Sequence, residues 1–333
     1  MRKWGWGVIV VLLLVGCQQA AVELSLPTLM PVAVLPAAPM ATLPATMDLN
    51  MDVATAVPLA SPPATSTPLT VITLAPDPEL TPLPDLPSEN RFTCRTEAAL
   101  TAVSPIWIVR PGPWPRPAAA SGLLGHYPDT GLKLLHLGFD VEGDPYFVGD
   151  LLDVLDKRQV KTTMFVLGSW ADTYPEWVQE FARRGHELAT HGYSHADMAS
   201  MTASQISAEL RDTEFSINSL TGQTTKPWLR PPFGSYSETS VQAAYAAGYT
   251  TVIWTGSAND WRSGMDADKM CATLRYYASP GAILYAHTNR AEVVTAVDRF
   301  IAEMQDAGYT FVPLSLLLAD DPADWLQRVE VED

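Results

Sequence analysis

The stretch Leu137-Gly138-Phe139-Asp140-Val141-Glu142-Gly143 joins an apolar run to two carboxylates. If the run is a β-strand, Asp140 and Glu142 stand two residues apart and project from the same side of it. Further along the chain, His191-Gly192-Tyr193-Ser194-His195 places two histidines four residues apart. That spacing predicts one face of a helical turn, from which both imidazoles can reach a single metal ion.

Together the two stretches describe a metal site with a spare carboxylate. Two imidazoles and one carboxylate leave an ion such as zinc one open position, and the second carboxylate is free to act as a base. Each part also has a plainer interpretation when taken alone. The histidine pair can be a surface coincidence, Asp140 can cap the turn at the strand end, and Glu142 can be a solvated loop acid.

From Leu132 the pattern alternates apolar runs with amphipathic runs. The candidate strands are Leu134–Asp140, Thr162–Leu167, His186–Ala189, Trp228–Pro231, Thr250–Trp254, Ala282–His287 and Thr310–Pro313. The candidate helices are Tyr146–Lys157, Pro175–Arg184, Ala203–Leu220, Glu238–Ala247, Asp266–Ala278 and Ala291–Ala307. Gly185, Gly248 and Gly308 stand where helix C-caps belong, each followed by a strand. Repeated β-α units predict a parallel sheet with covering helices, either open or closed into a barrel.

The N-terminus has the composition of a targeting segment. Arg2 and Lys3 precede an apolar run, Trp4–Val15, which is too short to span a membrane comfortably. Leu14-Val15-Gly16-Cys17 resembles a bacterial lipobox, in which the cysteine is lipidated and becomes the mature N-terminus. We therefore expect a lipoprotein signal peptide over residues 1–17 and a secreted protein, anchored by lipid to a bacterial membrane and facing the periplasm or the cell exterior. The alternative is an ordinary signal peptide or a short anchor.

Between Gln18 and Asn90 the chain contains no Lys or Arg, and prolines interrupt every candidate run. We expect a disordered, partly extended linker over residues 18–90, with a short strand near Leu69–Leu74 as its one candidate element. Residues 91–131 are expected to form an N-terminal extension packed on the domain, with a strand at Ile106–Val109. The domain itself is expected over 132–320, followed by an acidic C-terminal tail, 321–333.

Charge and cysteine content restrict the partners and the redox compartment. The formal net charge of -16 argues against nucleic acid as a partner and favours a neutral glycan over a strongly anionic one. The chain has 3 cysteines. With Cys17 lipidated, Cys94 and Cys271 remain as a pair in an oxidising location. Whether they form a disulfide stays open, because sequence does not place them within bonding distance.

Further motifs follow in order along the domain, at Arg230-Pro231-Pro232-Phe233-Gly234, Asp260-Trp261 and Ile283-Leu284-Tyr285-Ala286-His287. With the first two stretches they resemble the polysaccharide deacetylases (NodB-homology domain, carbohydrate esterase family 4), here as a lipoprotein-anchored member. The resemblance covers roughly Leu132 to Leu318. It implies a distorted (β/α) barrel of about seven parallel strands, with every motif at or just after the C-terminal end of a strand, where such barrels place their chemistry.

The resemblance also implies a role for each motif residue. The implied metal ligands are Glu142, His191 and His195, holding one divalent ion, with zinc the first choice and cobalt, nickel or manganese the alternatives. The implied catalytic residues are Asp140 as general base, Arg230 as its partner, His287 as general acid and Asp260 as the carboxylate that orients this acid. The backbone N–H of Phe233 would stabilise the oxyanion, and Trp261 and Tyr285 would line the substrate pocket. From the residues alone, Arg230 could equally be a surface ion-pair residue and His287 a core histidine.

Four positions depart from the family pattern: Glu142 for aspartate, Gly192 for serine or threonine, Ser257 for aspartate, and Tyr285 for leucine. An N-acetyl amide is a poor electrophile, so its hydrolysis needs a polarised carbonyl, an activated water and a proton for the amine. The sequence predicts such a hydrolase acting on peptidoglycan, a chitin-like polymer or an exported polysaccharide. The alternatives are an O-acetyl carbohydrate esterase and a catalytically silent glycan-binding lipoprotein.

Overall fold

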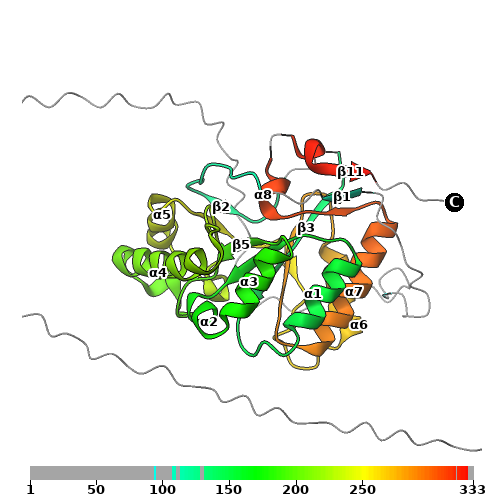
Figure 1. The fold of residues 1–333 in the computed structure, drawn as a ribbon, viewed down its shortest axis with the longest axis horizontal. Helices are drawn as coiled ribbons and strands as arrows, with labels where there is room; N and C mark the ends of the chain where they lie inside the picture. The colour runs from blue at the N-terminus through cyan, green and yellow to red at the C-terminus, as the bar shows by residue number, and fades with distance from the viewer. Residues whose placement is uncertain (1–93, 95–106, 110–112, 128–130, 320, 329–333) are drawn as a thin grey trace, which may run out of the picture. The chain divides into compact units, whose positions relative to one another are not determined.

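The computed structural model (Figure 1) describes residues 94, 107–109, 113–127, 131–319 and 321–328. The predictions for the signal peptide, for Cys17, for the linker 18–90 and for a strand near Leu69–Leu74 lie outside these residues. Within them, no helix combines the length and the apolar character needed to cross a membrane.

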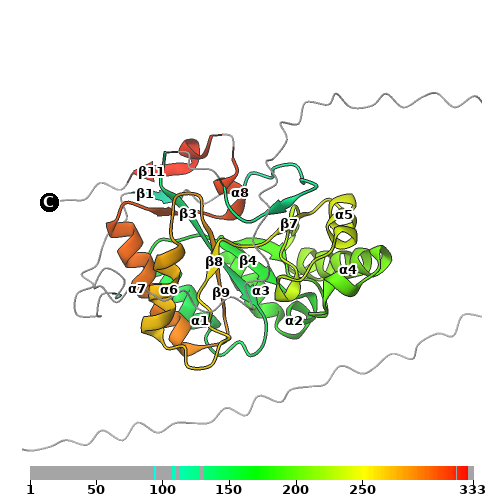
Figure 2. The same cartoon turned by 180° about the vertical axis from the view of Figure 1, so that it is seen from behind.

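The domain is built on a nine-stranded sheet, ordered β2-β7-β6-β5-β4-β3-β9-β8, with β10 pairing β3 beside this path. Every strand pair in it is parallel. The strands are β2 (Leu123–Leu124), β3 (Leu134–Val141), β4 (Thr163–Val166), β5 (Glu187–Thr190), β6 (Trp228–Leu229), β7 (Thr250–Val252), β8 (Gly256–Ser257), β9 (Ile283–His287) and β10 (Thr310–Phe311). The curled sheet confirms the predicted NodB-like (β/α) barrel (Figure 2).

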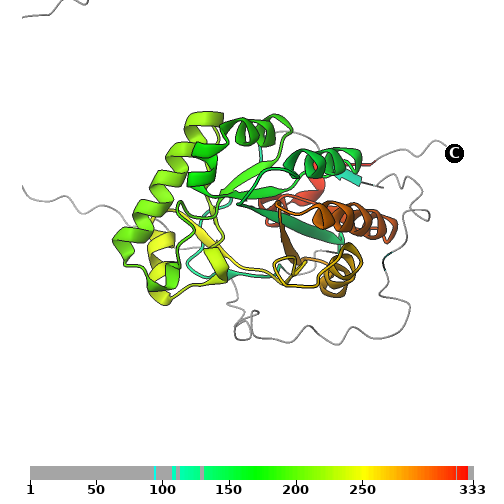
Figure 3. The ribbon, with the colours of Figure 1, turned by 90° about the horizontal axis from the view of Figure 1, so that it is seen from below.

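Helices surround the outer side of the curved sheet (Figure 3). They are α1 (Val148–Lys157), α2 (Gly168–Thr173), α3 (Pro175–Arg183), α4 (Ala203–Thr221), α5 (Glu238–Ala246), α6 (Ala267–Tyr277) and α7 (Ala291–Asp306). Helix α1 shows why they pack there. Its buried residues, Val148, Leu151, Leu152 and Leu155, fall at spacings of three, four and seven, which is one stripe of a helix. The short α8 (Leu314–Leu317) packs instead in a second core cluster with strand residues such as Leu134 and Phe165.

Strand β3 is buried along all 8 of its residues. Leu135, Leu137 and Phe139 alternate along it and join the main core cluster with the helices. His136 and Asp140 alternate with them and are also buried, at 0% and 2% exposure. A strand buried on both faces is typical of a parallel sheet covered by helices.

All seven strands and six helices predicted from Leu132 onward are present, within a few residues at their ends. Gly185, Gly248 and Gly308 each follow the C-cap residue of a helix and have φ of 80°, 89° and 84°, so the predicted glycines do end these helices, one position beyond the C-cap. The pattern did not predict β2, β8, α2 or α8. Each has only two to six residues, too few to show a period.

The extension and the C-terminal segment meet each other. Strand β1 (Trp107–Val109), in the predicted position, pairs antiparallel with β11 (Leu326–Arg328). Of the residues assigned above to an acidic tail, Pro322–Trp325 form a 3-10 helix and the next three form β11. These residues are therefore ordered parts of the fold, because β1 offers them a strand to pair with.

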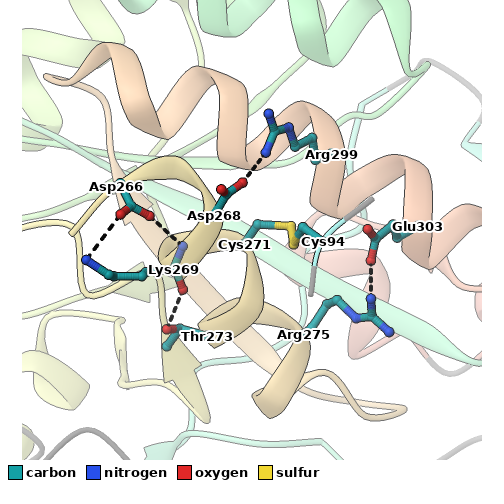
Figure 4. Close-up of a disulfide and its surroundings, with 9 residues drawn as sticks. All are labelled: Cys94, Asp266, Asp268, Lys269, Cys271, Thr273, Arg275, Arg299 and Glu303. Carbon is teal, nitrogen blue, oxygen red and sulfur yellow. Dashed lines mark hydrogen bonds and ion pairs between the residues drawn. A yellow bond between two sulfur atoms is a disulfide. The ribbon is translucent and has the colours of Figure 1, made fainter. Parts of the chain in front are cut away.

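Cys94 and Cys271 form a disulfide between residues 177 positions apart (Figure 4). Cys271 lies on α6, and the nearby α7 contributes ion pairs from Arg299 to Asp268 and from Glu303 to Arg275. The bond settles a question that the sequence left open, and it attaches residue 94 to a helix of the domain.

Candidate active site

Three potential metal ligands converge at the carboxyl ends of the strands. Glu142 directly follows β3, His191 directly follows β5, and His195 lies in the loop beyond. One ligand atom from each of these residues lies within 4.8 Å of the other two. His195 Nε2 is 2.7 Å from Glu142 Oε2. The three side chains therefore form one group, although Glu142 lies far from the histidines in sequence.

The loop from His191 to His195 is not the helical turn that the spacing predicted. Its residues take no helical conformation, and Gly192 and His195 have left-handed φ values of 83° and 58°. The imidazoles converge through this loop, with ring centroids 5.4 Å apart. A spacing of four residues is compatible with both geometries, and the left-handed residues select the loop.

The protonation states of His191 and Glu142 suit the binding of a cation. Burial lowers the pKa of His191, which keeps its imidazole neutral, the form that binds metal. Its Nδ1 lies 2.9 Å from the carbonyl oxygen of Arg230, so that nitrogen donates and Nε2 keeps its lone pair. Burial tends to raise the pKa of Glu142, but the His195 hydrogen bond and the neighbouring histidines lower it to about 2. One carboxylate and two imidazoles are a donor set that fits a divalent ion such as zinc.

Asp140 and Arg230 form a buried ion pair beside this group. Arg230 Nη1 donates to Asp140 Oδ1 at 2.7 Å, and the two side chains are 0% and 4% exposed. The guanidinium lies 3.9 Å from the centre of the Phe165 ring and 5.2 Å from that of Tyr285. Arg230 is therefore no surface residue. Its planar cation fixes the Asp140 carboxylate in place.

His287 and Asp260 form a second pair. Asp260 Oδ2 accepts from both the backbone N–H and the Nδ1 of His287, at 3.1 and 3.0 Å. Burial lowers the pKa of His287, but the Asp260 carboxylate outweighs it, and the pKa rises to about 9. Nε2 of this imidazole lies 3.7 Å from Glu142 Oε1. Asp140 and His287 are also register partners on β3 and β9.

Aromatic side chains form a wall next to His287. Trp261 is 40% exposed and stacks on Tyr285 with ring centroids 5.9 Å apart, while Trp254 contacts the same tyrosine at 4.3 Å. Tyr285 is 4% exposed, and burial raises its pKa well above the ordinary value. The tyrosine therefore lies beneath Trp261 as a neutral phenol.

Phe233 lies on the opposite motif loop, in the 3-10 turn Pro232–Gly234 after β6. It has a left-handed φ of 60°, is 53% exposed and sets its ring against His195 at 4.5 Å. Gly234 is required beside it, because an added Cβ would lie 2.5 Å from the Trp254 ring. The loop thus brings Phe233 against His195 of the metal-ligand group, and the oxyanion role of its backbone N–H stays a prediction.

Three residues at the site were not singled out from the sequence. Trp254 packs on Tyr285, and Arg290 donates to the backbone carbonyls of Asp260 and Met265. Glu209, on α4, accepts hydrogen bonds from the loop between the two histidines. Each falls within or beside an ordinary amphipathic run, so no local pattern distinguished it from a structural residue.

The fold and this group of carboxylates and histidines define the class: a (β/α) barrel with a group of candidate metal ligands at the carboxyl ends of its strands. A family model described as "Polysaccharide deacetylase" matches residues 128–252. The peptidoglycan-N-acetylmuramic acid deacetylase PdaA of Bacillus subtilis is 31% identical over 192 residues, covering 57% of this chain and 73% of the relative. A chitooligosaccharide deacetylase of Bradyrhizobium sp. is 27% identical over 203 residues, covering 56% and 92%.

Solved structures agree with these relatives. The structure of Bacillus subtilis PdaA, a family 4 carbohydrate esterase, matches with a TM-score of 0.56 and 26% identity, covering 65% of this chain and 98% of that one. The Bc1960 peptidoglycan N-acetylglucosamine deacetylase matches with a TM-score of 0.54 and 28% identity, covering 58% and 90%. The chain belongs to the polysaccharide deacetylase family of enzymes.

Proposed function

We propose that this protein is a metal-dependent hydrolase that removes acetyl groups from an N-acetylated sugar of a cell-envelope or extracellular polysaccharide. One observation carries the proposal. Asp140 and His287 are register partners on neighbouring strands, and His287 faces the metal-ligand group through Glu142. A carboxylate base and an imidazolium acid beside one cation site are what amide hydrolysis needs.

Asp140 acts as the general base. It takes a proton from water as a carboxylate, and Arg230 Nη1 holds its Oδ1 at 2.7 Å. The burial of both groups keeps the carboxylate oriented, because neither side chain can relax into solvent. Removing the guanidinium would leave an uncompensated buried charge, so Arg230 serves both the fold and the reaction.

His287 acts as the general acid for the departing amine. With its pKa at about 9, it is protonated at neutral pH, and its Nδ1 is held by Asp260. Nε2 is then the atom from which the proton leaves. Trp261 and Tyr285 lie beside the ring and offer an apolar wall to an acetyl methyl group.

Glu142, His191 and His195 would hold the metal, and a divalent ion there would supply a Lewis acid for the amide carbonyl. Zinc suits two imidazoles and one carboxylate, and cobalt, nickel or manganese could replace it. The longer arm of Glu142, compared with aspartate, already brings its carboxylate within 2.7 Å of His195.

The substrate we propose is an acetylated amino sugar within a polymer, such as peptidoglycan, a chitin-like glycan or an exported polysaccharide. The names of the relatives support this class. The net charge of -16 favours a neutral glycan over a strongly anionic one. We also propose that Cys17 is lipidated and that the linker lets a membrane-anchored domain search such a polymer, with no role for nucleic acid.

Acetate release tests the function. The full chain, loaded with zinc, should release acetate from chitooligosaccharides or peptidoglycan faster than from O-acetylated xylan. The reverse preference would favour an O-acetyl esterase acting through the same residues. Binding of glycan without acetate release from any of these substrates, in protein shown to hold about one zinc per chain, would instead indicate the silent glycan-binding protein.

A further inference from the structure

Residues 192–194 form the short loop between the two proposed histidine ligands. Gly192, its first residue, and His195, directly after it, have left-handed φ values, and a non-glycine residue in that region costs on the order of 1 kcal/mol or more. Such a loop does not hold its shape by local preference. Contacts from outside must keep it in place if His191 and His195 are to face the same point.

Glu209, on the middle of α4, supplies a charged contact of this kind. Its Oε2 accepts from the backbone N–H of Tyr193 at 2.7 Å and of Ser194 at 2.9 Å. Its Oε1 accepts from the Ser194 hydroxyl at 2.7 Å. Two successive N–H groups pointing the same way form a concave site for an anion, and hydrogen bonds to a carboxylate are stronger than neutral ones.

The other side of the loop is held by neutral groups. The first backbone N–H groups of α2, from Gly168 and Ser169, donate to the carbonyls of Gly192 and Tyr193 at 2.9 and 3.0 Å. A Cβ added to Gly192 would lie 2.9 Å from a Met198 methyl and 3.4 Å from the Glu209 carboxylate. The glycine therefore permits the left-handed turn and also leaves room for the carboxylate.

We propose that Glu209 is a positioning residue for the metal site. Its carboxylate holds the 192–194 loop so that His191 and His195 converge with Glu142. The inference rests on the proposed function, because it takes both histidines as ligands. Glu209 is not among the three groups that lie together as potential ligands, so it acts through the loop N–H groups and not on the ion.

Zinc affinity of the metal-stripped full chain, measured by competition with a fluorescent chelator, tests the proposal. Glu209→Ala should weaken binding by about 10- to 100-fold, the usual effect of removing an outer partner of a metal site. Glu214→Ala is the matched control. Glu214 lies on the same helix and likewise accepts a backbone N–H and a hydroxyl, both from Thr225, away from the histidine loop. It should leave zinc affinity within twofold of the wild type.

Two further variants separate the length of the side chain at position 209 from its charge. Glu209→Gln keeps the length and one oxygen able to accept both N–H groups, whereas Glu209→Asp keeps the charge but withdraws the carboxylate. Positioning through hydrogen bonds predicts tighter zinc binding by the Gln variant than by the Asp variant. The reverse order would show a through-space charge effect and overturn the proposal. This pair decides the matter even if Glu209→Ala is not recovered folded.

Amide hydrogen exchange gives a readout that needs no metal. In the metal-free Glu209→Ala protein, the N–H groups of Tyr193 and Ser194 should exchange faster, while those of Glu214→Ala should not change. His191→Ala distinguishes a failure of the positioning role of Glu209 from a failure of the proposed metal site. If it abolishes zinc binding while Glu209→Ala binds like the wild type, the positioning role is wrong. If His191→Ala keeps full affinity, the metal site itself is wrong.

Discussion

Replacing Asp260 by asparagine separates the charge of this residue from its shape. The side chain of asparagine still offers an oxygen to His287 Nδ1, whose distance to the present carboxylate is 3.0 Å. What it removes is the negative charge that stabilises the imidazolium. Asp260→Asn should therefore leave His287 in place but let burial determine its protonation.

The size of the effect follows from the protonation of His287. Burial lowers the pKa of His287, while Asp260 with its hydrogen bond and, to a smaller extent, the Asp140 and Glu142 carboxylates raise it to about 9 from an ordinary 6.5. Without the Asp260 charge, the two remaining carboxylates oppose burial, and the pKa should fall to about the ordinary 6.5. At pH 8 a group with a pKa of 9 is about 90% protonated and one with a pKa of 6.5 about 3%, so activity should drop about 30-fold. At pH 6 the same comparison gives a loss of less than about twofold.

The measurement is the pH profile of kcat/KM for acetate release, with an NMR titration of the His287 ring in the zinc-loaded protein. The alkaline limb should move to lower pH, because the acid must be protonated to act. Asp268→Asn, which removes a carboxylate paired with Arg299 on the surface, should leave the limb unmoved. An unmoved limb in Asp260→Asn, or an equal loss at pH 6 and pH 8, would refute the reasoning.

Four other outcomes are expected. Cys17→Ser should lose its lipid mass and its partitioning with membranes, and unchanged partitioning would contradict the anchor. Glu142→Gln should weaken zinc binding far more than Glu142→Asp, because it loses the charge, so equal affinities would return Glu142 to a solvated loop acid. Cys271→Ser should lower the free energy of unfolding in urea by at most about 5 kcal/mol for a loop of 177 residues, and no change would mean that the bond does not constrain the unfolded chain. Burial lowers the pKa of His136 and of His186 to about 3, so as the pH falls from 6.5 the unfolded chain takes up these two protons before the folded chain does. The free energy of unfolding should therefore fall by about 1.4 kcal/mol for each histidine and each pH unit between pH 6.5 and 3. A free energy of unfolding that stays constant from pH 6 to pH 4 would contradict this.

The sequence predicted the elements because each carries its own signal. The buried run at Leu134–Val141 has the composition of a central parallel strand, and the glycines after α3, α5 and α7 mark helix ends. Once the strands are parallel, their carboxyl ends share one edge, so residues far apart in the chain must meet there. The contact of Arg230 with Asp140, across 90 positions, follows from this geometry.

The features that the sequence could not predict are those that depend on contacts with other elements of the fold. Strands β2 and β8 have two residues each and exist because β7 and β9 offer them hydrogen bonds. The conformation of the His191–His195 loop is chosen by α2 on one side and Glu209 on the other, and both contacts cross from elements distant in sequence. A spacing of four residues carries no information about either.

Two of the departures from the family pattern, Ser257 and Tyr285, lie next to each other in the folded protein. Ser257 and Tyr285 stand apart in sequence, yet they are register partners on β8 and β9. Tyr285 packs against the tilted ring of Trp254 and the stacked ring of Trp261, and Ser257 is within hydrogen-bonding range of Asn259. Changes that accumulate after loss of function have no reason to pack against one another beside an intact Asp260–His287 pair. The packed wall therefore argues for an altered substrate pocket in an enzyme, and against decay into a silent binding protein.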